Sequence, residues 1–168
     1  MEIDRPFDHW NVLARLSFTP LPATTVKLAD LGLRTDREYI VYEFWSRKLI
    51  GVFKTEFPSP AQMAKEVRIY SIHEKLDHPQ VISTNRHISQ GGVDLTEVQW
   101  DSRTSTLTGK SSVVKNDLYT LTIFVPSGLR AGKALVGGRA AAIRTVGPAV
   151  EVSFTPGAST TIPWTVSF

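Results

Sequence analysis

The sequence contains no cysteine, and this absence excludes both disulfide bonds and thiolate metal sites. Burial of apolar side chains must therefore hold the fold together. No uninterrupted apolar run approaches the roughly 20 residues needed to cross a bilayer, and residues 1–5 lack the apolar segment of a secretory signal peptide. We expect a chain that is neither embedded in a membrane nor secreted by a signal of its own, and the cellular compartment stays undetermined.

Charge of one sign is not in large excess, because 19 basic and 16 acidic residues leave a net charge of +3. No short window is rich in lysine and arginine, so the sequence argues against nucleic acid as a partner. With 42% hydrophobic and 21% charged residues, the composition is that of an ordinary globular protein without a disordered tail. The length of 168 residues predicts one domain, residues 1–168, built around one continuous core.

Strand signals dominate the chain, because β-branched and aromatic residues alternate with polar ones in short runs broken by Gly, Pro, Asn and Asp. Short strands of this kind, with frequent turns, predict an all-β fold, namely an antiparallel β-sandwich with Greek-key or meander connections and little or no helix. Turns are expected at Asn116-Asp117 and Gly147-Pro148, and residues 58–66 are the one place for a short helix or turn. The expected strands cover residues 12–18, 25–28, 38–45, 48–53, 67–75, 80–83, 93–100, 104–109, 112–115, 118–125, 140–146, 149–155 and 161–168.

One histidine lies on a well-defined strand. The period of two places Ser71 and His73 on one face of the expected strand and Tyr70 and Ile72 on the other. We expect His73 to be a structural residue that is hydrogen-bonded at a sheet edge, and a ligand-binding or acid/base role is the alternative.

The densest group of polar side chains lies between two expected strands, beside the pair Gly91-Gly92. Backbone amides next to glycine can approach a partner closely, so this loop could bind a hydroxyl-rich ligand or contact a partner domain. The alternative is structural, because Asn, Ser and Gln side chains also satisfy the backbone groups of a loop that crosses the end of a sandwich. The candidate residues in the loop are Asn85, Arg86, His87 and Gln90.

The four tryptophans could fill the core or stack on sugar rings. Core or domain contact is the favoured role, because the tryptophans are scattered along the chain rather than aligned on one sheet face. Trp100 is the best candidate for an exposed platform, since it leads into the polar turn that follows.

Strong catalytic signatures are absent. The sequence has no nucleophile elbow, no dinucleotide or phosphate-binding glycine loop, no zinc helix and no calcium loop, so we expect neither a cofactor nor a metal. Two carboxylates about 5 to 10 Å apart can hydrolyse glycosides, but Asp94 and Glu97 are three residues apart and point to opposite sides of a regular strand. A triad of Ser83 or Ser89 with His87 and Asp94 is possible, yet such combinations also arise by chance.

Several segments carry a family resemblance. They are FDHWNVLA (7–14), LADLGL (28–33), YIVYEFW (39–45), IGVF (50–53) and STNRHISQGGVDL (83–95), the last followed by Trp100-Asp101 and a turn at 107–109. In this order they resemble the domain that follows the catalytic barrel in glycoside hydrolases of the alpha-galactosidase superfamily. The resemblance implies that the chain is an excised C-terminal accessory β-sandwich of a larger enzyme and that its partner is a (β/α)8 barrel. The family's catalytic aspartates belong to that barrel, so none is carried onto this sequence.

Three functional hypotheses follow. In the first, the chain is a non-catalytic accessory domain that packs against and stabilises the barrel, with residues 84–92 at an interdomain contact or near the substrate entrance. In the second, it is a carbohydrate-binding module that uses the 84–92 loop and Trp100. In the third, it is a free-standing histidine-dependent or metal-dependent protein built around His73 and His87, which requires the two side chains to lie close together with an acidic partner.

Overall fold

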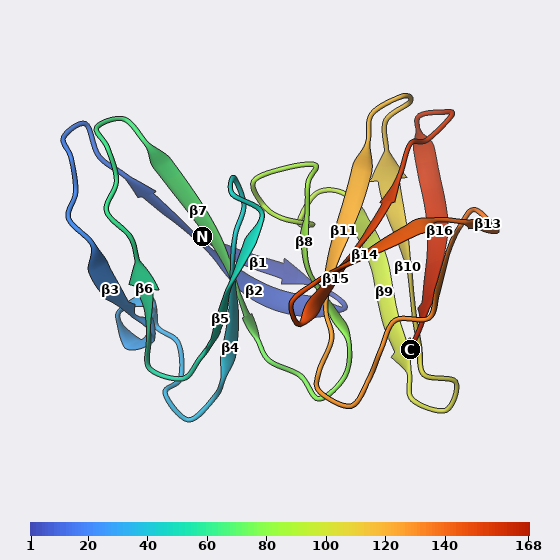
Figure 1. The fold of residues 1–168 in the computed structure, drawn as a ribbon, viewed down its shortest axis with the longest axis horizontal. Coiled ribbons are helices and arrows are strands. Elements are labelled where there is room, and N and C mark those ends of the chain that lie inside the picture. The colour runs from blue at the N-terminus through green and yellow to red at the C-terminus, as the bar shows by residue number, and fades with distance from the viewer. The chain divides into compact units, whose positions relative to one another are not determined.

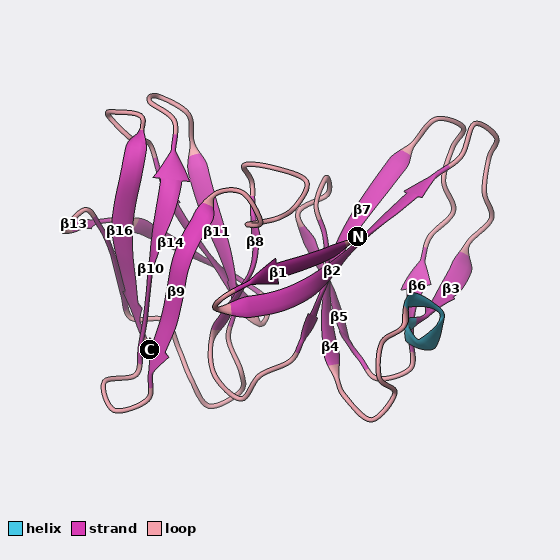
Figure 2. Cartoon of the chain, turned by 180° about the vertical axis from the view of Figure 1, so that it is seen from behind, coloured by secondary structure: helices cyan, strands magenta, loops and turns pink.

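The computed structural model describes all residues from 1 to 168, and its regular secondary structure is almost entirely β-strand (Figures 1 and 2). The single helical element is the short 3-10 helix η1 (Leu28–Leu31), and no helix is long and apolar enough to cross a membrane. All strand pairings with a defined register are antiparallel, so the predicted all-β antiparallel fold is confirmed. The strands are β1 (Glu2–Arg5), β2 (Asp8–Leu16), β3 (Thr24–Lys27), β4 (Tyr39–Glu43), β5 (Lys48–Phe53), β6 (Glu56–Ser59), β7 (Val67–Glu74), β8 (Gln80–Thr84), β9 (Leu95–Asp101), β10 (Thr106–Val113), β11 (Tyr119–Phe124), β12 (Lys133–Val136), β13 (Arg139–Ala140), β14 (Ala142–Val146), β15 (Ala149–Phe154) and β16 (Thr160–Ser167).

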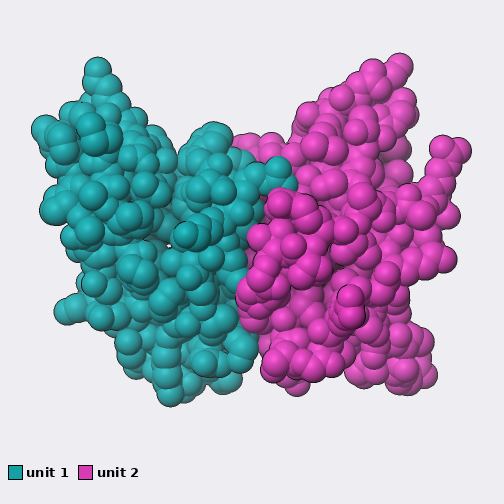
Figure 3. Space-filling model, viewed as in Figure 1, with its two compact units in different colours: residues 1–3, 9–75 teal, residues 4–8, 76–168 magenta.

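The chain divides into two compact units, coloured separately in Figure 3. Unit 1 holds residues 1–3 and 9–75, and unit 2 holds residues 4–8 and 76–168. Many of the buried apolar residues form two clusters, one in each unit. Composition and length bound the amount of core but not its partition, so the expectation of one domain with one continuous core stays a prediction.

Unit 1 is built on a five-stranded sheet in the order β1-β2-β7-β4-β5 and a two-stranded ribbon of β3 and β6. Tyr39 and Val41 of β4 and Tyr70 and Ile72 of β7 point to the same core, where Phe57 of β6 packs edge-on against Tyr70. The alternation predicted for β7 is thus confirmed.

Unit 2 is a β-sandwich. One sheet has the order β13-β12-β16-β10-β9 and the other the order β14-β15-β11-β8, and both contribute to one core. The expected turn at Asn116-Asp117 is present, with the Asp117 N–H donating to the Val114 carbonyl at 3.2 Å. It leads from β10 in one sheet to β11 in the other, so it closes a corner of the sandwich rather than a hairpin. The turn at Gly147-Pro148 joins the paired strands β14 and β15.

Local details differ from the sequence expectations in three respects. The strands β1, β6 and β12 were not expected, because four residues are too few to show a clear period. Residues 58–66, where a short helix or turn was expected, do contain a turn, but they also form the end of β6 and an isolated bridge between Gln62 and Leu21. Gly109 does not end a strand at a turn, since β10 runs through it from Thr106 to Val113 and takes in much of the expected strand 112–115.

Candidate functional site

The polar loop between β8 and β9 begins by extending the pairing of β8 with β11. Asn85 Nδ2 donates to the Leu118 carbonyl at 2.8 Å, and Asn85 Oδ1 accepts the Thr120 N–H at 2.8 Å. The Asn85 backbone N–H also donates to the Thr120 carbonyl at 3.2 Å. Both the nitrogen and the oxygen of this side-chain amide therefore bind backbone groups at the start of β11 and continue the hydrogen-bond pattern of the sheet.

The next two candidates also bind groups of unit 2. The Arg86 guanidinium forms an ion pair with Asp117, which lies in the corner turn between the two sheets. His87 Nδ1 accepts the Ser89 backbone N–H at 3.1 Å and lies 2.9 Å from Ser89 Oγ. This local pattern holds the tip of the loop in a tight turn, with the His87 ring exposed.

Gln90 is the most buried of the loop candidates, with 1% of its surface exposed. Its Oε1 accepts the Ser83 hydroxyl at 2.9 Å, and its Nε2 is buried without a hydrogen-bond partner. Gly91 follows with φ 113°, and a Cβ there would lie 2.6 Å from Leu95 Cδ1. The positive φ favours glycine at this position, and a larger residue would also have to displace the Leu95 side chain.

The loop ends at Asp94, whose carboxylate lies inside the sandwich. Asp94 Oδ2 accepts the Tyr119 hydroxyl at 2.6 Å, and Tyr119 Oη lies 3.0 Å from Ser111 Oγ. Ser111 Oγ in turn accepts the Trp164 Nε1–H at 2.9 Å. Burial raises the pKa of the Asp94 carboxyl, and the Tyr119 hydrogen bond, the Thr84 hydroxyl and the Arg86 charge offset this only in part. Burial and the Asp94 charge likewise raise the pKa of Tyr119.

The four hydrogen-bonded side chains come from segments that are far apart in sequence, and each of the four residues is only 0% to 2% exposed. Its members hydrogen-bond to one another within a closed interior, which suits a polar core network more than a reaction site. The structure joins Asp94 to Tyr119 and His87 to Ser89, while Ser83 binds Gln90. Two members of the possible triad, His87 and Ser89, therefore contact each other, whereas Asp94 and Ser83 bind residues outside it.

Trp100 is half-buried rather than a free platform. Its ring stacks on His78 with centroids 5.7 Å apart and meets the edge of Phe168 at 5.9 Å. The exposed tryptophan is instead Trp45, at 60%, whereas Trp10 and Trp164 are core residues. The expectation that Trp100 would be the most exposed tryptophan is wrong, because contacts with His78 and Phe168, both distant in sequence, cover it.

His73 lies in the middle of the unit 1 sheet, with β2 on one side of its strand and β4 on the other. It is 1% exposed and stacks on Trp10, its cross-strand partner, with ring centroids 5.1 Å apart. The expected position at a sheet edge is wrong, and the structural role that was favoured agrees with this packing. His73 belongs to unit 1 and His87 to unit 2.

Two motifs of the family resemblance have a structural explanation in unit 1. In YIVYEFW, the buried Glu43 carboxylate accepts three backbone N–H groups, from Trp45 at 3.2 Å, Ser46 at 2.6 Å and Ile69 at 3.2 Å. In IGVF, Gly51 has φ 151° and the Phe53 ring comes within 3.0 Å of the point where a Cβ would lie. The Glu43 carboxylate therefore stabilises the turn after β4, and Gly51 makes room for the packing of Phe53.

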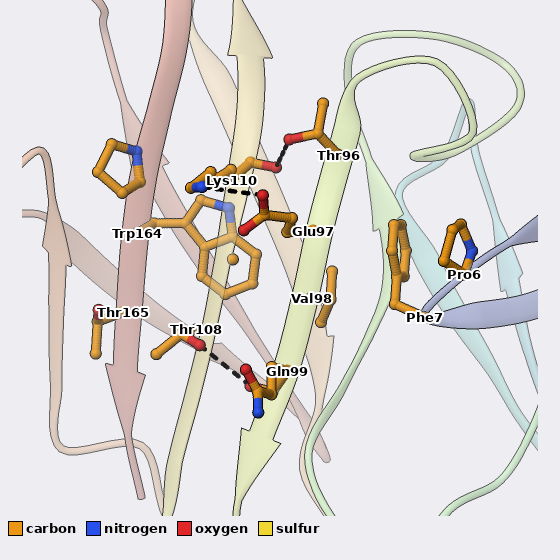
Figure 4. Close-up of a pocket in the computed structure, with 12 residues that line it drawn as sticks. Pro6, Phe7, Thr96, Glu97, Val98, Gln99, Thr108, Lys110, Trp164 and Thr165 are labelled. Carbon is orange, nitrogen blue, oxygen red and sulfur yellow. Dashed lines mark hydrogen bonds and ion pairs between the residues drawn. The ribbon is translucent and has the colours of Figure 1, made fainter.

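A groove that the sequence did not indicate lies at strands β9, β10 and β16 of unit 2 (Figure 4). It has a volume of about 440 Å³ and is bounded beyond β9 by Pro6 and Phe7. Alternating strand residues are hard to recognise as a binding surface from sequence, because their neighbours are set by register across strands rather than by spacing along the chain. The register aligns Glu97 with Lys110 and Gln99 with Thr108.

Comparison of the chain with protein-family models and with curated protein sequences finds no match. The resemblance to the alpha-galactosidase superfamily stays a prediction from the segments quoted above.

Proposed function

We propose that this chain is a non-catalytic accessory β-domain of an alpha-galactosidase-like glycoside hydrolase, which packs against and stabilises a (β/α)8 catalytic barrel. The observation that carries the proposal is how the most distinctive motif, residues 83–95, uses its polar side chains. Asn85, Arg86 and Asp94 bind Leu118, Asp117 and Tyr119 respectively. This use of polar groups is typical of a scaffold.

The other resembling segments support the same role. The carboxylate of Glu43 and the contact between Gly51 and Phe53 fix a hairpin and its packing, and neither presents a reactive group to solvent. Because these residues stabilise the domain itself, the domain can offer a rigid surface to the barrel that we propose as its partner.

The hypothesis of a carbohydrate site at residues 84–92 and Trp100 has less support. Three of its side chains, those of Asn85, Arg86 and Gln90, are engaged with the sandwich, and the Trp100 ring lies between His78 and Phe168. A ligand would have to displace these contacts before binding.

The test begins with the gene that encodes this chain. We expect an upstream segment that encodes a (β/α)8 barrel with two catalytic carboxylates. The barrel should then be purified with and without residues 1–168. We expect the barrel alone to have a lower melting temperature. The kcat of the fraction that stays in solution should change little. Absence of a barrel from the parent protein, or equal melting temperatures for the two forms, would refute the proposal.

A further inference from the structure

The outer face of strands β9, β10 and β16 carries two cross-strand rows of side chains. Strand register aligns Glu97, Lys110 and Pro163 in the first row and Gln99, Thr108 and Thr165 in the second. All six line the groove of about 440 Å³, while Leu107, Trp164 and Val166 of the same strands belong to the core. The outer face of these strands is therefore polar, and their opposite face packs into the apolar core of unit 2.

Four side chains of this face, those of Thr96, Glu97, Thr108 and Lys110, are held in place by contacts that Figure 4 shows. Lys110 Nζ donates to Glu97 Oε1 at 2.9 Å, Thr96 Oγ1 donates to the Lys110 carbonyl at 3.3 Å, and Thr108 Oγ1 donates to the Gln99 carbonyl at 3.4 Å. Side chains that are already positioned lose less conformational entropy when a ligand binds. The core side of the same strands is also fixed, because the indole of Trp164 occupies the space where a Gly109 side chain would lie.

The hydrogen-bonding groups that remain available in the groove are of both kinds. The side-chain amide of Gln99 and the hydroxyl of Thr165 make no hydrogen bond within the chain, and Lys110 has two further protons to donate. The carboxylate of Glu97 retains lone pairs, and its charge is balanced by Lys110. A site for an anion would offer hydrogen-bond donors, and a site for a metal cation would offer acceptors. This groove offers both with no net charge, which matches vicinal hydroxyl groups, because each hydroxyl both donates and accepts.

The ends of the groove suit the same ligand. Pro163 lies in the first row, and Pro6 and Phe7 lie beyond β9 (Figure 4). Pro6 and Pro163 are exposed apolar rings that can pack against the C–H faces of pyranose rings while the polar rows bind the hydroxyls, whereas the Phe7 ring has Arg5 over one face and packs against the core. We propose that this groove, rather than the polar loop at residues 84–92, binds a short segment of a neutral saccharide chain. This inference goes beyond the accessory role and does not depend on the presence of a barrel.

The test is a two-dimensional NMR titration of the full 168-residue chain with neutral gluco-, galacto- and xylo-oligosaccharides of two to six units. We expect saturable shifts at amides of β9, β10 and β16 with at least one of them. Gln99→Ala and Thr165→Val should each weaken that binding by about two- to ten-fold, which corresponds to the loss of one hydrogen bond. Thr161→Val is the matched control, because Thr161 lies on the same strand and face but does not line the groove.

Both groove variants replace side chains on the solvent-facing side of the sheet, so unchanged melting temperatures should show that they remain folded. A flat response to every saccharide would overturn the inference, as would shifts confined to residues 84–92. Binding that both variants retain at full strength would also overturn it. Saturable binding of inorganic phosphate at the groove would show an anion site instead. None of these results bears on the barrel experiment, so the two proposals fail separately.

Discussion

The indole ring of Trp164 lies across Gly109, its cross-strand partner, so closely that a Cβ on residue 109 would be 2.2 Å from Trp164 Cζ2. This contact joins the core of unit 2 to the floor of the groove and requires a residue without a side chain. It also explains why a glycine stands in the middle of an eight-residue strand.

Gly109→Ala should destabilise the protein, because neither the indole nor the Glu97 carbonyl at 2.5 Å can make room without distorting the sheet. We expect a loss of about 1–3 kcal/mol in the free energy of unfolding, measured by urea denaturation. Gly157→Ala is the control, since nothing lies within 4 Å of a Cβ at that position. Equal stability of the two variants would contradict the close contact.

Glu43→Ala should also be strongly destabilising, because it removes the acceptor of three backbone N–H groups, one of them the buried N–H of Ile69. We expect a cost on the order of 2–4 kcal/mol, with Glu43→Gln intermediate because its amide retains one oxygen. Hydrogen exchange at Trp45 and Ser46 should become faster in the alanine variant. Unchanged exchange there would show that the carboxylate does not hold the turn.

Asp94 should give stability a specific pH dependence. Because folding raises the pKa of this carboxyl, its contribution is fully present below the unfolded pKa of about 3.9. It is lost as pH rises through the raised folded-state pKa. Asp94→Asn should therefore gain stability relative to the wild type between pH 4 and pH 7, measured by urea denaturation at both values. A constant difference between the two proteins would contradict the burial of a titrating carboxyl.

Asp36→Asn provides a control of opposite sign for the pH experiment. The Arg34 guanidinium lowers the pKa of the Asp36 carboxyl, so its contribution is present above the unfolded pKa and is lost as pH falls through the lowered folded-state pKa. This side chain is exposed, so the expected effect is small. A large effect of the same sign as that of Asp94→Asn would show that the pH dependence is not local.

Asn85→Ala should lower stability by about 1–2 kcal/mol, because it removes the hydrogen bonds to the Leu118 carbonyl and from the Thr120 N–H. Asn85→Asp keeps the acceptor and should cost less. Neither change should alter saccharide binding at the groove, which chemical shift titration of each variant can check. Loss of saccharide binding in a folded Asn85→Ala protein would show that the saccharide binds at the loop of residues 84–92 and not at the groove.

The sequence by itself determined the class of fold. Alternation of apolar and polar residues and turn residues such as Gly147-Pro148 are local signals, and they predicted most strands, including the bounds of β5. The two faces of β7 followed from the same period. The polar stretch around His87 could also be recognised from the sequence, but the hydrogen-bond partners of its side chains could not.

The tertiary structure alone decided the division into two compact units and the partner of each polar side chain. Asn85 binds residues 33 and 35 positions away, and Asp94 binds Tyr119, 25 positions away. Likewise, Trp100 is covered by Phe168 and His78, and the rows of the groove join three strands. Such contacts depend on strand order and register, which are set by the collective packing of whole sheets and not by any short stretch of sequence.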